Sequence, residues 1–186
     1  MPAHRATPSG LIAVDISIDD GDWSWLKAPE KTIESAVQAI PYEVAKGGAA
    51  NGHDHAVVAI SLSSDVIVAS LNGRYRQKRK PTNVLSFPAG TGSAAGFLGD
   101  IVVASETVLR EAKENFVPAK HHLQHLIVHG VLHLLGFNHE NNRDAERMET
   151  LEIEILASMG IANPYTEPLE TGTRVATGRR PAPAKR

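Results

Sequence analysis

The spacing of hydrophobic residues changes along the chain from short apolar runs to a helical repeat. The apolar runs indicate β-strands over residues 11–18, 57–62, 84–87 and 98–104. A Gly/Ser/Ala-rich linker joins the last two runs, which suits a hairpin. A helical spacing is expected over residues 29–45, 105–115, a stretch that begins near residue 118, and residues 143–159.

One segment, residues 63–71, fits two interpretations. Ser63, Ser64 and Asp65 can cap a short helix that runs to residue 71. The β-branched residues 66–68 suit a strand equally well. Local propensity therefore leaves both structures open.

This order of elements predicts an α+β fold, because strands come first and the chain ends in helices. We expect a small mixed sheet of about four strands packed with about five helices, with the histidine-bearing helix at the centre. A length of 186 residues suits one compact domain, which we place at residues 11–160. Residues 1–10 are expected to be flexible, and residues 161–186 to form a disordered basic tail.

The amino-acid composition excludes some kinds of site but does not indicate a binding partner. Hydrophobic residues make up 42% and charged residues 22%, as in ordinary soluble proteins. Cysteine is absent, so disulfides and thiolate metal sites are excluded. We see neither a signal peptide nor a membrane span and expect a cytoplasmic protein with no membrane partner. A net charge of −2 gives no global argument for a polyanionic ligand.

The helix expected after residue 118 carries a metal-binding pattern of histidines. His129 and His133 are four residues apart, so both side chains lie on one helix face. Gly136 can adopt the left-handed conformation that ends a helix, which would bring His139 back as a third ligand. Three histidine nitrogens that leave one position for water are typical of a catalytic zinc site. We therefore predict that these three histidines hold one zinc ion.

The neighbouring histidines are expected to have other roles. Six of the nine histidines lie within residues 121–139. His125 shares a face with the first two ligands, but it lies about 12 Å from His133 along the helix axis, so it cannot join them on one ion. We expect His125 to support the site, and His121 and His122 to be solvated or hydrogen-bonded.

Gly130 distinguishes this pattern from that of zinc peptidases. In those enzymes a glutamate follows the first histidine and acts as the general base. A glycine inside a helix costs about 1 kcal/mol relative to alanine, so something favours it here. The close approach of a substrate or of another backbone is one candidate.

Residues 129–139, HGVLHLLGFNH, resemble the signature of the YbeY family of bacterial metal-dependent endoribonucleases. Two further segments support the resemblance in the same order. Residues 71–76, LNGRYR, followed by residues 80–88, KPTNVLSFP, are similar to the central motif of the family. Residues 98–102, LGDIV, are similar to its last strand.

The resemblance covers about residues 11–160 and carries several implications. It implies a single α+β domain with zinc on the three histidines, and it favours a helix for residues 65–71. It also implies a role in ribosomal RNA maturation, especially at the 16S 3′ end, and in ribosome quality control, with ribosomal components as partners. The family commonly has aspartate before the third histidine, where this chain has Asn138. Because asparagine cannot act as a base, we assign it no such role.

A basic segment contains the residues that we expect to contact the substrate. Five cations occur within the seven residues 74–80, which we expect to form a loop: Arg74, Arg76, Lys78, Arg79 and Lys80. A solvated basic loop is one interpretation; phosphate contacts to RNA are the other. Arg76 matches the arginine of the Tyr-Arg pair in the family, so we expect it to hold a phosphate through a bidentate contact.

The predicted function is a single-strand-specific, zinc-dependent endoribonuclease acting on ribosomal RNA, with no DNA substrate expected. Its catalytic residues would be Arg76, His129 and His133. One alternative is a ribosome assembly factor whose zinc is structural and which does not cleave RNA. Another is a zinc metallopeptidase, against which Gly130 and the basic segment both weigh.

Overall fold

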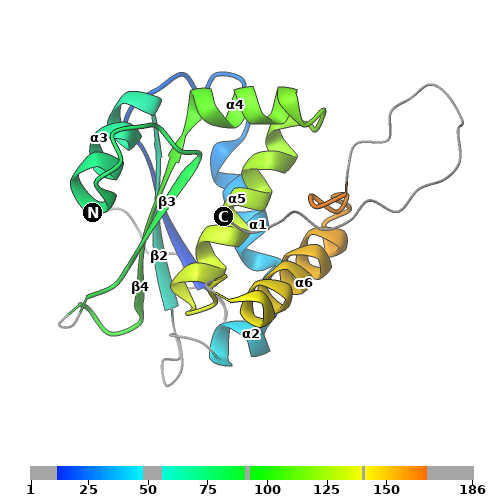
Figure 1. Cartoon of the computed structure of the whole chain (residues 1–186). Helices are drawn as coiled ribbons and strands as arrows, with labels where there is room; N and C mark the ends of the chain where they lie inside the picture. Colours follow the sequence, from blue (N-terminus) through cyan, green and yellow to red (C-terminus); the bar gives the residue numbers. More distant parts are fainter. Residues whose placement is uncertain (1–11, 48–55, 91–92, 140, 167–186) are drawn as a thin grey trace, which may run out of the picture.

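The computed structural model describes residues 12–47, 56–90, 93–139 and 141–166. Strands and helices are interspersed up to residue 104, and helices follow (Figure 1). The elements are β1 (Ile12–Ile18), α1 (Pro29–Gln38), α2 (Tyr42–Gly47), β2 (Ala56–Ser63), α3 (Asp65–Arg76), β3 (Val84–Pro88), β4 (Phe97–Ala104), α4 (Ser105–Glu114), α5 (Ala119–Leu134) and α6 (Asn142–Ser158).

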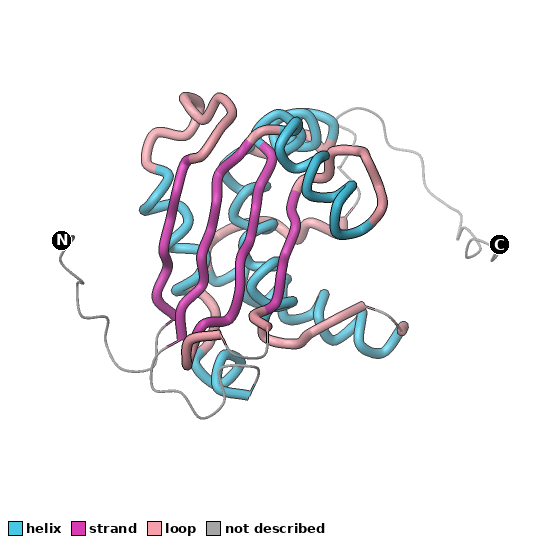
Figure 2. Tube along the Cα trace, turned by 90° about the vertical axis from the view of Figure 1, so that its left-hand side faces the viewer, coloured by secondary structure: helices cyan, strands magenta, loops and turns pink. Residues whose placement is uncertain are grey.

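The four strands form one mixed sheet in the order β1-β2-β4-β3. β1 runs parallel to β2, and β2 runs parallel to β4. β3 is an edge strand that pairs antiparallel with β4, as expected for a hairpin. Figure 2 shows the four strands side by side, with most of the helices behind them. The α+β prediction is therefore confirmed.

The two faces of the sheet bury different sets of side chains. The main core lies on one face, where α5 packs against the sheet and against α1, α4 and α6. The helix that carries the histidines is therefore central, as predicted. On the opposite face α3 covers a smaller cluster that includes Val68, Leu85 and Val102. Figure 1 shows α3 and α5 on opposite sides of the strands.

Residues 65–71 form a helix, which settles the segment that local propensity left open. Ser64 caps this helix by accepting a hydrogen bond from the backbone N–H of Ile67. The helix buries Val68 and extends to Arg76, where Gln77 ends it in a left-handed conformation with φ of 58°. The predicted basic loop is therefore wrong for its first residues, since Arg74 and Arg76 lie in the last helical turn.

The helix expected over residues 29–45 is divided into α1 and α2. Pro41 separates them, and a proline disfavours helical backbone at the residue before it.

The boundary expected at residue 160 also needs correction. Ile161 is buried in the core, and the hydroxyl of Tyr165 donates a hydrogen bond to Glu152. The expectations for residues 1–10 and 167–186 lie outside the described residues.

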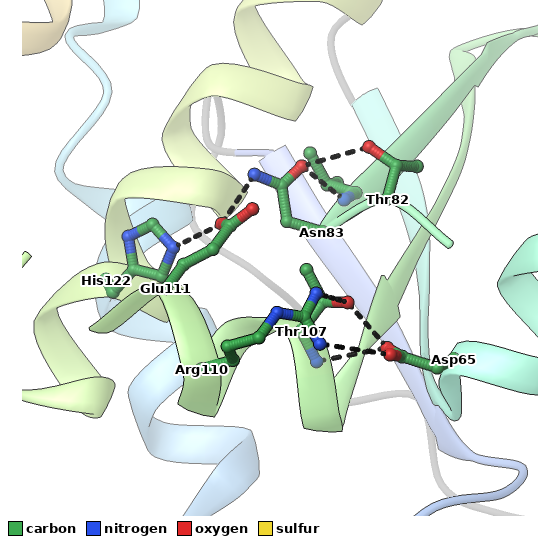
Figure 3. Close-up of polar contacts among 8 residues, drawn as sticks. Asp65, Thr82, Asn83, Thr107, Arg110, Glu111 and His122 are labelled. Atoms are coloured by element: carbon green, nitrogen blue, oxygen red, sulfur yellow. Dashed lines mark hydrogen bonds and ion pairs between the residues drawn. The ribbon is translucent and has the colours of Figure 1, made fainter. Parts of the chain in front are cut away.

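Polar contacts fix the helices to one another at the top of the sheet in Figure 1. Asp65 at the start of α3 accepts hydrogen bonds from the backbone and hydroxyl of Thr107 in α4, at 3.0 and 2.7 Å (Figure 3). In return, Glu106 accepts one from the backbone N–H of Asp65 at 2.8 Å. Each acidic side chain thus satisfies an N–H at the start of the other helix.

Among the described residues, no helix is both long and apolar enough to cross a membrane.

Candidate metal centre

The C-terminal end of α5 brings the three predicted ligands together. Each of His129, His133 and His139 offers a nitrogen, and these atoms all lie within 4.8 Å of one another. The Nε2 atoms of His129 and His133 are 3.0 Å apart, as the four-residue spacing predicts. The ring centroid of His139 lies 5.0 Å from that of His133 and 6.0 Å from that of His129. The cluster can therefore hold a metal ion.

A glycine-ended turn places the third histidine. Gly136 has φ of +95°, which a side-chain-bearing residue rarely adopts. Its N–H bonds to the carbonyl of His133 at 3.0 Å, and the N–H of Phe137 bonds to that of Leu132 at 3.0 Å. These two bonds form the motif that commonly ends helices at glycine. The chain reverses there, so His139 returns beside the end of the helix.

Two acceptors orient the imidazoles of the helical pair. The Nδ1 atom of His129 lies 2.7 Å from Oε1 of Glu152, and Nδ1 of His133 lies 3.0 Å from the carbonyl oxygen of Phe137. A carboxylate and a carbonyl oxygen only accept, so each Nδ1 carries a proton, and in its neutral form each ring presents an unprotonated Nε2 to its neighbour. Two Nε2 lone pairs thus converge on the space that the cluster surrounds.

Glu152 of α6 is the supporting residue that the sequence interpretation missed. Its side chain is fully buried, and it also contacts His125 at 3.0 Å and the hydroxyl of Tyr165. Burial raises the pKa of its carboxyl, but the hydrogen bonds from His125, His129 and Tyr165 outweigh burial and lower it to about 2. The group is therefore a carboxylate at neutral pH, and through it His125 is linked to the ring of His129. Its signal in the sequence was a charge in the apolar stripe of α6, one turn after Met148.

The environment of His133 favours the neutral, metal-binding form of imidazole. Burial is the largest cause that lowers its pKa, and repulsion from a charged His129 adds to it. Together they lower the pKa to about 4. A metal ion therefore does not need to displace a proton from His133 at neutral pH.

Gly130 faces the sheet and not a substrate. A Cβ atom at this position would lie 2.9 Å from Cδ1 of Ile101 and 3.1 Å from Oγ of Ser86. The reason for the glycine is thus close contact between α5 and side chains of β4 and β3. Close approach of a substrate or of another backbone, as considered from the sequence, is not the reason. A glutamate here would point into this interface and away from the histidines. The peptidase general base consequently has no place in this site.

The basic segment is exposed and separated from the histidines by the sheet. Arg74 and Arg76 lie on α3, which packs on the face opposite α5, and Lys78, Arg79 and Lys80 follow it. Tyr75 is 59% exposed and packs edge-on against Phe87 of β3, with ring centroids 5.2 Å apart. In the described part of the chain, no hydrogen bond or ion pair joins Arg76 to the three histidines. The edge strand β3 contacts both Tyr75 and α5, and so connects the two sides.

Sequence comparisons identify the relatives of this chain. The family model described as Endoribonuclease YbeY matches residues 18–160. A protein named Endoribonuclease YbeY from Bradyrhizobium diazoefficiens is 46% identical over 152 residues, which are 77% of this chain and 80% of that one. Its namesakes from Parvibaculum lavamentivorans and Azorhizobium caulinodans are 42% and 45% identical, and the matches cover 87% and 84% of this chain and 88% and 98% of theirs.

One solved structure is also similar to the chain. It is the solution structure of TM1509 from Thermotoga maritima, which is 22% identical with a TM-score of 0.48 and covers 87% of this chain and 99% of its own. The family model spans most of the described fold, including all three clustered histidines. The chain therefore belongs to the YbeY endoribonuclease family.

Proposed function

We propose that this chain is a metal-dependent endoribonuclease that cuts single-stranded RNA. The observation that carries the proposal is the pair of imidazoles on α5, whose Nδ1 atoms are each held by an acceptor so that both Nε2 atoms converge. Membership of the YbeY family supplies the reaction class. His129, His133 and His139 would hold the metal, and zinc is the ion that an all-histidine site with an open position best suits.

The residues of the chain have separate proposed roles in supporting the metal and binding the RNA. A bound zinc ion supplies a Lewis acid and a water of lowered pKa beside the phosphate. Glu152 and the carbonyl of Phe137 keep two ligand rings in place. Arg76 binds a phosphate through its planar guanidinium and offsets the charge that develops on it. Arg74, Lys78, Arg79 and Lys80 add contacts to neighbouring phosphates, which requires the RNA to follow the β3 edge.

The biological role follows from the same resemblance. We propose that the RNA is ribosomal, that the chain acts in 16S 3′-end maturation and ribosome quality control, and that it works in the cytoplasm beside ribosomal components. The position of Gly130 against the sheet speaks against a peptidase. The following experiment distinguishes a nuclease from an assembly factor that binds RNA without cleaving it.

The test compares single-stranded RNA, duplex RNA and single-stranded DNA of one sequence as substrates. We expect cleavage of the single-stranded RNA alone. Arg76→Lys should lose at least tenfold in cleavage rate, because lysine keeps the charge but not the bidentate geometry. The matched control is Lys31→Ala, an exposed cation on α1, which should cleave like the wild type. Binding of RNA without cleavage by the wild type would favour the assembly factor.

A further inference from the structure

Phe116 occupies a position that local energetics would give to glycine. It follows the C-cap of α4 with φ of 54° and a side chain that is 86% exposed. The backbone N–H of Phe116 bonds to the carbonyl of Lys113 at 3.3 Å, and that of Val117 bonds to Ala112 at 2.9 Å. This is again the glycine-type helix end, in which a bulky residue is disfavoured. Folding therefore gains nothing from this aromatic ring, and such outliers point to function.

The ring lies at a pocket of about 360 Å³ between two distant parts of the chain. One wall is the α4–α5 turn with the first turns of α5, and the other is the segment after α6. Its apolar lining includes Phe116, Val117, Pro118, Ile161 and Pro164. A pocket that has both apolar and polar lining residues and includes an exposed aromatic ring suits a flat heterocycle.

Three histidines line the same pocket, and one of them is available to a ligand. His122 is held by Glu111 at 2.9 Å (Figure 3), and His125 is held by Glu152 at 3.0 Å. The half-buried side chain of His121 makes no hydrogen bond or ion pair within the described residues. Its imidazole can therefore donate or accept a hydrogen bond at the edge of a bound ring.

The pocket adjoins the metal centre along α5. The rings of His125, which lines the pocket, and of His129 lie 6.3 Å apart, and both contact Glu152. His121 is eight residues before His129, about 12 Å along the helix axis. A short stretch of single-stranded RNA covers this distance, so a strand at the metal can place a neighbouring base in the pocket.

We propose that this pocket binds one unpaired base of the RNA, a few nucleotides from the bond that is cut. The base stacks on Phe116 and hydrogen-bonds to His121, as unpaired bases commonly do with aromatic and polar side chains. This inference rests on the proposed function. It explains why a strained, exposed phenylalanine stands beside three histidines that the metal centre does not use as ligands.

The test uses the full-length, metal-loaded protein and Phe116→Gly, a change that relieves the backbone while removing the ring. We expect its thermal stability to be at least that of the wild type, and its kcat/KM on single-stranded RNA to fall roughly tenfold, the typical value of one base–aromatic stack. His121→Ala should give a smaller loss. Val66→Ala, an exposed apolar residue on α3, is the control and should cleave like the wild type.

Substrates with one abasic nucleotide at successive positions locate the base. For the wild type, one position near the cleaved bond should show the same tenfold loss, and in Phe116→Gly that position should cause no further loss. Full activity of Phe116→Gly on intact RNA, or an undiminished abasic effect in that variant, would overturn the pocket while leaving the nuclease intact. A wild type that neither binds nor cuts single strands would remove both proposals.

Discussion

Glu152 shows how one buried side chain determines the chemistry of the candidate metal centre. It is fully buried and shares its two oxygens among His125, His129 and Tyr165. A carboxylate in such a position is stable only with these partners, since burying an unpaired charge is costly. Its contact with Nδ1 of His129 also decides which nitrogen of that ring faces the cluster.

Replacement of this carboxylate should weaken metal binding more than folding. We expect Glu152→Gln, which keeps the shape, to lower metal affinity about 10- to 100-fold, because an amide no longer fixes the His129 ring as strongly. Isothermal titration of metal into the apoprotein measures the effect. Exposed Glu149→Gln on the same helix is the control. Unchanged affinity in Glu152→Gln would show that the contact does not orient the ligand.

The stability of the metal-free protein should fall in acid in two steps. The pKa of His133 is lowered in the fold to about 4 from an ordinary value of 6.5, so the unfolded chain binds more protons between these values and stability drops as the pH falls through them. The pKa of Glu152 is lowered to about 2. Its contribution is present above pH 4.5 and is lost as the pH falls toward 2.

Urea denaturation of the apoprotein at pH 7, 5.5 and 4 measures the first step. His133→Ala should reduce this loss, because the variant lacks that imidazole, whereas His122, whose pKa burial also lowers, still contributes a remainder. The same pH dependence in wild type and His133→Ala would contradict the assignment. Tyr165, whose pKa is raised mainly by burial and by its contact with Glu152, stays neutral across this range.

At the scale of elements, two helix ends of similar geometry have different consequences. α5 ends at Gly136 with φ of +95°, and α6 ends at Gly160 with φ of +73°. A Cβ atom would meet nothing within 4 Å at either position, so only the backbone conformation resists a side chain. One turn leads to His139 and the other leads to the buried Ile161.

This pair of glycines separates stability from metal binding. Gly136→Ala and Gly160→Ala should each lower the free energy of unfolding by about 1–2 kcal/mol, the cost of left-handed backbone for alanine. Only Gly136→Ala should also lower metal affinity, because it shifts the turn that carries His139. Denaturant melts and metal titrations of both variants give the comparison. Equal metal affinities would mean that His139 is not placed by this turn.

Much of this element structure could be predicted from the sequence, and the exceptions have physical reasons. The strands are predicted within a residue or two because each is a short apolar run between turn residues. The histidine pair is predicted because four residues make one helical turn. The contact of Glu152 with the histidines could not be predicted from the sequence, because it depends on how α6 packs on α5. The helical form of residues 74–76 depends in the same way on packing of α3 over the sheet.

In the whole molecule, the sheet lies between the candidate metal centre and the basic segment of residues 74–80. Histidines lie at the end of α5 on one face, and the basic segment follows α3 on the other. The proposed RNA would follow the β3 edge, since β3 contacts both Tyr75 and α5. A net charge of −2 is compatible with the proposed polyanionic substrate, since five of the 19 lysines and arginines lie together within residues 74–80.

Salt should expose this local electrostatic contribution. We expect affinity for single-stranded RNA to fall linearly with the logarithm of salt concentration, by a slope of about −0.7 for each phosphate contacted. Replacing Arg79 by Ala should reduce the slope by roughly one such contact. Fluorescence anisotropy at a series of salt concentrations provides the slopes. A slope that stays the same in the variant would place the RNA away from the basic segment.

The proposed metal-dependent cleavage is best tested by a metal titration of the apoprotein with two readouts. Bound zinc per chain and the rate of single-stranded RNA cleavage are recorded at each addition, for the wild type and for His133→Ala. We expect the rate to rise in proportion to bound metal and to level off at one ion per chain, whereas His133→Ala should bind little metal and stay inactive. Cleavage that proceeds at full rate in the metal-free wild type, or in a variant that has lost its metal, would contradict it.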